Sequence, residues 1–129
     1  MKSHEHLTLL GKSGVNAPGK HLESFKRPKN IVRVVMVSDE VTALCPVTGQ
    51  PDQYTVEISY YPKGKCIESK ALKLKLQSFR EVGVFCEQLA SDLADHVHES
   101  IHPESCTVKV TQKSRGGVSI VAMASYDGP

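Results

Sequence analysis

A stripe of apolar residues with helical spacing is the feature that most constrains the fold of this chain. The stripe returns every four positions, at Phe85, Leu89, Leu93, Val97 and Ile101. Because residues four apart share one face of a helix, this spacing predicts an amphipathic helix over residues 85–101 that ends before Pro103. A helix with one apolar face needs another element to cover that face, so the rest of the chain must supply a packing partner.

Four further segments have the composition and alternation of strands. Residues 31–37 are rich in β-branched side chains, residues 54–61 alternate apolar and polar positions, and similar patterns recur at 106–111 and 118–122. Residues 69–80 lack β-branched residues, which favours a second helix there. The order strand, strand, helix, helix, strand, strand predicts an α+β fold, an antiparallel four-stranded sheet with two helices on one face.

Length and composition limit the chain to one domain of ordinary size. It has 129 residues, of which 40% are hydrophobic, and a formal net charge of +2. Residues 1–30 contain several Gly and Pro and little periodicity, which predicts an extended arm before a single domain over residues 31–129. Without an apolar run suited to a membrane span or a signal peptide, we expect a cytoplasmic protein with no membrane partner.

The cysteine and histidine spacing gives little support for a metal site, and we predict none. The four cysteines stand at positions 45, 66, 86 and 106, and no two form a Cys-x-x-Cys pair. His98 and His102 are four residues apart, but Val97 and Ile101 take the apolar face of that helix. In the cytoplasm the cysteines are expected to be free thiols, of which one or two at most are reactive.

Cys45 is the first candidate for chemistry. It lies in a loop rich in Gly and Pro, residues 44–52, between two predicted strands. A thiolate is a strong nucleophile once its pKa is lowered. Asp52, across the turn, would place a carboxyl group over an adduct on Cys45, where it can donate or accept a proton. The spacing fits a buried cysteine and a turn-capping aspartate equally well, and both interpretations stay open.

Charged residues on the predicted helices form a second set of candidates. Lys70 and Lys73 share a helix face, which suits either an anion such as a phosphate or two solvated side chains. Glu87 begins the long helix, where the helix dipole stabilises a carboxylate. A buried Glu87 in a cleft would instead accept hydrogen bonds from a purine-like ring. The sequence alone does not separate these alternatives.

Several motifs together resemble one family, the NADPH-dependent nitrile reductases. These enzymes convert 7-cyano-7-deazaguanine to 7-aminomethyl-7-deazaguanine on the route to queuosine in tRNA. The segments that carry the resemblance are Leu44-Cys45-Pro46-Val47-Thr48-Gly49-Gln50-Pro51-Asp52, Glu68-Ser69-Lys70-Ala71-Leu72-Lys73-Leu74, Ser78-Phe79-Arg80, Arg115-Gly116-Gly117 and Thr8-Leu9-Leu10-Gly11. The resemblance covers most of the chain. It implies a tunnelling fold (T-fold) with the element order above, and a homo-oligomer of two stacked pentameric rings with active sites between subunits.

The resemblance also implies roles for individual residues. Cys45 would attack the nitrile carbon and form a covalent thioimide, and Asp52 would supply the proton to the nitrile nitrogen. The deazaguanine ring would be bound by Glu87, next to Cys86, with help from the segment Ile67-Glu68-Ser69. The phosphates of NADPH would be held by Lys70, Lys73 and Arg115, and two hydrides would be delivered for each nitrile.

Two departures from the family pattern keep other functions open. Cys86 stands where the family has His directly before the Glu, and Lys75 stands where the family signature ends in an aromatic residue. The alternatives are an amidinotransferase, which adds ammonia to the same thioimide on tRNA to form archaeosine without NADPH, and a non-catalytic deazapurine-binding protein. If Cys86 shares the pocket of Cys45, oxidation would link the two thiols and switch the enzyme off.

Overall fold

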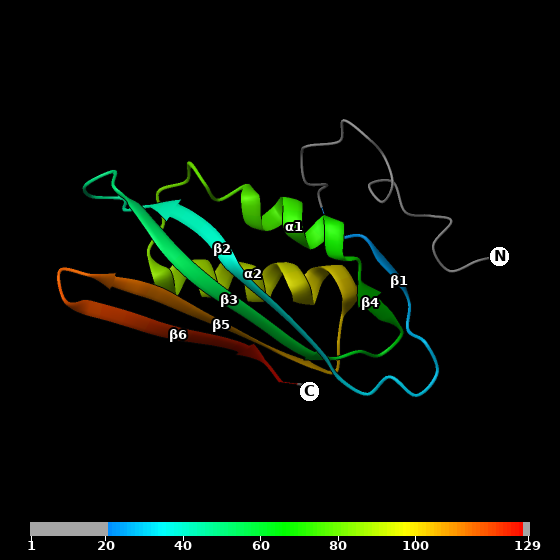
Figure 1. Ribbon diagram of the computed structural model, residues 1–129. Helices are drawn as coiled ribbons and strands as arrows, with labels where there is room; N and C mark the ends of the chain where they lie inside the picture. Colours follow the sequence, from blue (N-terminus) through cyan, green and yellow to red (C-terminus); the bar gives the residue numbers. More distant parts are fainter. Residues whose placement is uncertain (1–20, 128–129) are drawn as a thin grey trace.

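The fold is an antiparallel four-stranded sheet with two helices on one of its faces (Figure 1). The computed structural model describes residues 21–127. The strands lie side by side in the order β2 (Val34–Leu44), β3 (Pro51–Tyr61), β5 (Ser105–Arg115) and β6 (Val118–Tyr126). The α+β class and the order of two strands, two helices and two strands, predicted from the sequence, are confirmed for this sheet.

A second, two-stranded sheet was not predicted. Strand β1 (Ser24–Lys26) pairs antiparallel with β4 (Lys65–Ile67). Each strand has three residues, which is too short for alternation to reveal it in the sequence. Residues 21–30 of the predicted arm therefore include a paired strand, and Leu22 there is 4% exposed. Residues 1–20, with the remainder of the predicted arm, lie outside the described range.

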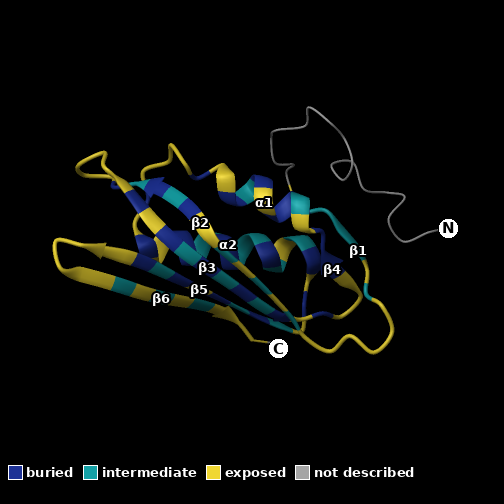
Figure 2. Ribbon diagram, in the orientation of Figure 1, coloured by how far each residue is buried: buried dark blue, intermediate teal, exposed yellow. Residues whose placement is uncertain are grey.

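Alternation along β3 separates the two faces of the large sheet. Asp52, Tyr54, Val56, Ile58 and Tyr60 are buried on the inner face, and the residues between them are exposed or half-buried (Figure 2). On the outer face, the sheet exposes large apolar side chains from its two edge strands, Val35, Val37, Val121 and Met123. The central strands carry polar side chains on this face, such as Glu57 opposite Lys109, so the exposed apolar residues follow the two edges of the sheet.

The helices cover the inner face of the sheet. Helix α2 (Cys86–Ile101) packs on β5 and β6, and α1 (Ser69–Gln77) lies beside β2. The apolar stripe begins one residue later than predicted. Phe85 is 56% exposed at the N-cap of α2, whereas Cys86 is 1% exposed and fills the first buried position. The prediction that placed Phe85 in the stripe is therefore wrong, because the helix starts after it.

Candidate functional site

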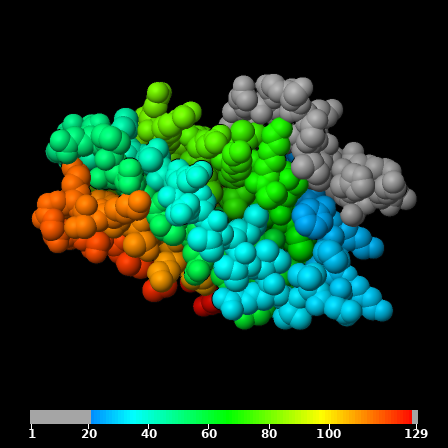
Figure 3. Space-filling view, viewed as in Figure 1, coloured from blue at the N-terminus to red at the C-terminus, as the bar shows by residue number. Residues whose placement is uncertain are grey.

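The loop of residues 45–50 lies at one end of the sheet, next to the turn between β5 and β6 (Figure 3). Residues 82–84, which lead into α2, fix the start of this loop. Leu44 donates its N–H to the Val82 carbonyl at 2.9 Å and accepts from the Val84 N–H at 3.0 Å. Gly83 lies against Pro46, whose Cα is 3.4 Å from the position that a Cβ on Gly83 would take. The chain around Cys45 is thereby tied to the beginning of α2.

Within the loop, backbone hydrogen bonds hold Cys45 in a tight turn. The Cys45 N–H donates to the Gln50 carbonyl, and the Gly49 N–H donates to the Cys45 carbonyl, both at 2.8 Å. Gly49 has a φ of +72°, a left-handed conformation that glycine adopts without strain. The turn leaves the Cys45 side chain 7% exposed.

The turn also changes the acidity of the Cys45 thiol. Hydrogen bonds from the Thr48 hydroxyl, and then from the backbone N–H groups of Thr48 and Val47, lower the pKa of Cys45 to about 6. Arg115 adds a smaller effect in the same direction. Because the thiolate is the nucleophilic form, most of Cys45 is ready to attack an electrophile at neutral pH.

Asp52 forms an ion pair with Arg115, whose side chain also bonds to Cys45. Its Oδ1 lies 2.8 Å from Nε of Arg115, and the side chain of Asp52 is 5% exposed. Arg115 also donates from Nη1 to Oε1 of Gln50 at 3.0 Å. Arg115 thus interacts with both predicted residues, Cys45 and Asp52.

Two further side chains reach this cluster from the core. Cys86 donates its thiol to the Val110 carbonyl at 3.6 Å, and burial raises its pKa. All four cysteines are free thiols, so the oxidation of Cys45 and Cys86 stays a prediction. Tyr54, two residues after Asp52 on the inner face, is near enough to the cluster to feel the charges of Asp52 and Cys45, and it was not among the predicted residues. Its position next to Asp52 was the signal, but strand patterns count tyrosine as an apolar residue.

The residues predicted to bind the deazaguanine ring lie in two places. Glu87 is exposed on the first turn of α2, beside Cys86. Ile67, Glu68 and Ser69 lie where β4 passes into α1. The Glu68 carboxylate caps α1, accepting from the N–H groups of Lys70 at 2.8 Å and Ala71 at 2.9 Å. Glu68 thus has a structural role of its own.

The predicted cofactor residues are also divided between two places. Lys73, together with Ser69, lines a groove of about 410 Å³ between α1 and β2, which also includes Glu40, and Lys70 lies half-buried on the same helix. Arg115 is instead part of the Asp52 cluster at the end of β5. Within one chain, the contacts of Arg115 are therefore with Asp52 and the Cys45 loop.

Known proteins resemble this chain over nearly its whole length. A family model described as QueF-like protein matches residues 51–129. The NADPH-dependent 7-cyano-7-deazaguanine reductase of Syntrophus aciditrophicus (strain SB) is 39% identical over 95% of this chain and 88% of its own length. The protein of the same name from Frankia casuarinae is 38% identical, over 93% of this chain and 95% of its own length.

A solved structure has the same fold. It is the crystal structure of the archaeosine synthase QueF-Like in the apo form, with a TM-score of 0.73 and 25% sequence identity. The match covers 78% of this chain and 99% of that one. The tunnelling fold predicted from the sequence is thereby confirmed. The fold, the family model and the relatives agree, and this chain belongs to the QueF family, that of the NADPH-dependent 7-cyano-7-deazaguanine reductases.

Proposed function

We propose that this protein is a nitrile reductase that converts 7-cyano-7-deazaguanine to 7-aminomethyl-7-deazaguanine with NADPH, in the biosynthesis of queuosine. The observation that carries the proposal is the Cys45 thiol of lowered pKa beside the Asp52–Arg115 ion pair. A nitrile carbon is a weak electrophile, and a thiolate is the side chain best suited to attack it. The names of the reductases that this chain resembles support the same substrate and cofactor.

In the proposed reaction, Sγ of Cys45 attacks the nitrile carbon and forms a thioimide. Because Cys45 is already a thiolate at neutral pH, the nitrile nitrogen takes one proton from solvent through the Asp52 carboxyl group, so that thiolate, nitrile and one proton give the neutral thioimide. Arg115 keeps the Asp52 side chain directed at the loop. NADPH, when bound, would supply two hydrides, and one further proton completes the reduction to the aminomethyl group. The carbon–sulfur bond breaks between the two hydride additions and returns Cys45 as the thiolate.

The residues available to hold NADPH fit its phosphates. Lys73 presents a cation at the groove between α1 and β2, and Lys70 lies one turn earlier on the same helix. Ammonium groups of this kind bind phosphate oxygens as point charges.

The proposed site combines two copies of the chain. The predicted residues lie near the two ends of β3, one group near Tyr54 and the other near Tyr60. Tyr60 comes six positions after Tyr54, which is about 20 Å along a strand. Cys45 and Asp52 lie at the Tyr54 end, whereas Ile67 bonds to Tyr60 at the other. We propose a ring-shaped homo-oligomer, two stacked pentamers, in which the Cys45 end of one copy meets the Ile67 end of the next. The exposed apolar side chains of the two edge strands, β2 and β6, support such an assembly.

A second candidate function is supported by the solved archaeosine synthase and by Cys86 in the position where the resemblance implies His. It is an amidinotransferase that adds ammonia to the Cys45 thioimide on tRNA and needs no NADPH. Both functions use Cys45 and Asp52 in the same way. They differ in the second reactant, so one experiment separates them.

The test is NADPH consumption by the purified protein with free 7-cyano-7-deazaguanine, together with mass spectrometry of the intact protein. A reductase consumes two NADPH for each nitrile. A thioimide on Cys45 without NADPH loss contradicts the reductase, and ammonia and tRNA are then added. Product on tRNA identifies the amidinotransferase, and a persistent adduct identifies a binding protein.

No helix among residues 21–127 is long and apolar enough to cross a membrane. A substrate that enters tRNA modification would be met in the cytoplasm, and we propose that location for the enzyme.

A further inference from the structure

Six basic residues gather at the end of the sheet that holds Tyr60, away from Cys45. They come from residues 24–38, which include β1 and the start of β2, and from residues 58–67, which join β3 to β4. Neither segment contains a carboxylate side chain, although the whole chain has 14 Asp and Glu against 16 Lys and Arg. Figure 3 shows the first segment on the surface of the molecule, in blue and cyan. We call these six residues the basic face: Lys26, Arg27, Lys29, Arg33, Lys63 and Lys65.

Hydrogen bonds from Arg27 hold the two segments of the basic face together. The Arg27 N–H donates to the Gly64 carbonyl at 2.9 Å, and its Nε donates to the Lys63 carbonyl at 2.9 Å. Its Nη1 donates to the Ile31 carbonyl at 2.8 Å, which braces the connection between β1 and β2. The fold thus fixes the cations beside one another, and the guanidinium that does so donates to carbonyl groups and not to carboxylates.

Two lysines of the basic face lie directly opposite each other. Lys26 of β1 and Lys65 of β4 are register partners in the antiparallel pair, and both are exposed. Like charges at directly opposite positions destabilise a strand pair. The ion pair of Arg115 with Asp52 is the one that forms within residues 21–127, so no carboxylate of that range neutralises these cations. An anion bound between the two lysines would remove their repulsion.

An exposed aromatic ring lies within the basic face. Tyr61 is 41% exposed, two residues before Lys63. The guanidinium carbon of Arg33 lies 5.8 Å from the centre of the Tyr61 ring, and Arg33 Nε donates to the Ser59 hydroxyl at 2.9 Å. Aromatic rings and arginine planes beside a row of cations are the surfaces on which the bases of single-stranded nucleic acids stack.

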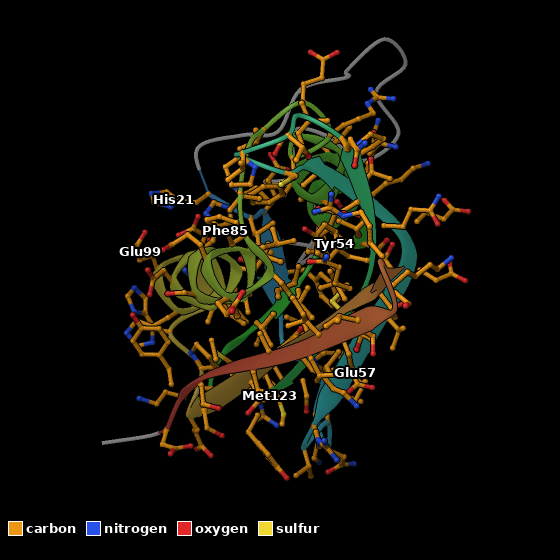
Figure 4. The ribbon with its side chains drawn as sticks, turned by 90° about the vertical axis from the view of Figure 1, so that its left-hand side faces the viewer. His21, Tyr54, Glu57, Phe85, Glu99 and Met123 are labelled. Atoms are coloured by element: carbon orange, nitrogen blue, oxygen red, sulfur yellow. The ribbon has the colours of Figure 1, made fainter. Side chains whose placement is uncertain are left out.

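Carboxylates at the border of the basic face are placed so that the positive charge persists. Glu57 lies opposite Lys109, and Figure 4 shows it on the side of the sheet away from α2, whereas Glu99 lies on α2 itself. The Glu68 carboxylate accepts from the N–H groups at the start of α1. Glu104 lies at the rim, where its N–H donates to the Tyr61 carbonyl at 2.9 Å.

We propose that the basic face binds a single-stranded nucleic acid, with its cations on the phosphates and Tyr61 stacked against a base. A ligand with several linked phosphates matches cations that come from two segments, and it bridges the opposed Lys26 and Lys65. A flat base matches the exposed ring, which a phosphate alone does not use. This inference goes beyond the proposed function and does not depend on it, because it uses no residue of the Cys45 cluster.

The test is fluorescence anisotropy of labelled oligouridylate and oligothymidylate, each of about twelve nucleotides, with the full-length protein over a range of salt concentrations. The double variant Lys26→Gln/Lys65→Gln should bind about tenfold more weakly at low salt. Its slope of log affinity against log salt should be shallower by about 1.4, which is about 0.7 for each lost phosphate contact. The matched control is Lys109→Gln/Lys113→Gln, which removes the same charge from exposed positions of β5 and should keep the wild-type slope.

The role of the ring is tested separately from that of the charges. Tyr61→Ala should weaken binding of both oligonucleotides about tenfold and leave the salt slope unchanged, because stacking involves no phosphate. Tyr61→Phe keeps the ring and should retain wild-type affinity. Size-exclusion chromatography of each variant checks that the oligomeric state is that of the wild type.

Several outcomes would overturn the nucleic-acid surface. An equal loss in the two double variants would show attraction by net charge alone. A wild-type protein that binds inorganic polyphosphate or phosphatidylserine vesicles but neither oligonucleotide would assign the face to another anion. A changed oligomeric state in Lys26→Gln/Lys65→Gln would make the face a contact between copies of the chain. Tighter binding of oligouridylate than of oligothymidylate supports the proposal with RNA as the ligand, and the reverse supports it with DNA.

The same preparations separate this inference from the proposed function. Oligonucleotide binding by a wild-type protein that neither consumes NADPH nor forms an adduct with 7-cyano-7-deazaguanine overturns the reductase and supports the nucleic-acid surface. NADPH consumption by a wild-type protein that binds neither oligonucleotide does the reverse.

Discussion

Strand β3 connects two ends of the molecule, and each end has a buried tyrosine and a cysteine in a different environment. At one end, the Tyr60 hydroxyl accepts a hydrogen bond from the Ile67 N–H, and burial raises the pKa of Cys66. At the other end, hydrogen bonds from the turn lower the pKa of Cys45, and the Tyr54 hydroxyl has no partner among the described residues. The tyrosine of the first end has a hydrogen-bond partner and its cysteine is protonated, whereas the second end has a thiolate and a tyrosine hydroxyl without a partner among the described residues.

The difference shows that hydrogen-bond donors in the turn outweigh burial at Cys45, whereas burial outweighs the hydrogen bond with Tyr60 at Cys66. Cys45 and Cys66 are both buried by exposed area, at 7% and 4%. Only Cys45 lies in a turn whose N–H groups and hydroxyl point at its sulfur. Burial without such donors favours the neutral thiol, and burial with them favours the thiolate.

Replacing Cys45, with Cys66 as the comparison, should have the largest effect on adduct formation. Cys45→Ala should abolish the adduct with 7-cyano-7-deazaguanine, since burial raises the pKa of Cys86, the other thiol of the cluster, and keeps it protonated. Cys66→Ala should retain it and lose stability through a small cavity. Intact-protein mass spectrometry measures the adduct. Equal adduct formation in wild type and Cys45→Ala would refute the assignment of the nucleophile.

Changing the carboxylate beside Cys45 should have the next largest effect. Asp52→Asn removes both the proton-transferring group and the charge that binds Arg115, and adduct formation should slow by about 10²–10⁴-fold. Glu57→Gln, on the outer face of the same strand, is the control and should leave the rate unchanged. Single-turnover kinetics measures both variants. A rate in Asp52→Asn within twofold of wild type would remove Asp52 from the mechanism.

The two thiols should also separate by pH. Because the pKa of Cys45 is about 6, its alkylation by iodoacetamide should be about tenfold slower at pH 5 than at pH 8, with a midpoint near pH 6. The rate falls as pH drops through the pKa, since the thiolate is then protonated. Cys66 should remain unmodified over this range while the protein is folded. Peptide mapping after timed labelling measures each site, and a Cys45 midpoint near pH 9 would contradict the effect of the turn.

Replacing a glutamate at each end of the molecule should have the smallest effects. Glu68→Ala removes the cap of α1 near the Tyr60 end and should lower the free energy of unfolding by about 1 kcal/mol. Glu87→Ala, exposed near the Cys45 end, should change stability by less than about 0.5 kcal/mol but weaken nitrile binding. Urea denaturation and calorimetric titration measure the two quantities. Unchanged nitrile binding in Glu87→Ala would contradict the assignment of Glu87 to the ring.

The sequence predicted the architecture because its signals are local. The spacing of Leu89, Leu93 and Val97 and the alternation of β3 each depend on neighbouring residues, and both are confirmed. The short strands β1 and β4 escaped prediction, since three residues carry no period and their pairing joins distant parts of the chain.

The candidate site was predicted only in part. The loop around Cys45 and Asp52 has a motif, and both residues are brought together. The contact of Arg115 with Asp52 depends on how far the β5–β6 hairpin extends, which no local pattern gives. The missing hydrogen bond of the Tyr54 hydroxyl depends on the three-dimensional surroundings of that group, which no local sequence pattern gives.

The hydrogen bonds between Leu44 and residues 82–84 have a consequence for motion. Leu44 leads into the Cys45 turn, and Val84 leads into α2, where Glu87 lies. The two segments form one cooperative unit, so an opening that releases the nucleophile also releases the start of the helix that carries Glu87. The amides of Leu44 and Val84 should exchange with solvent deuterium at the same rate, and a bound substrate should slow both together.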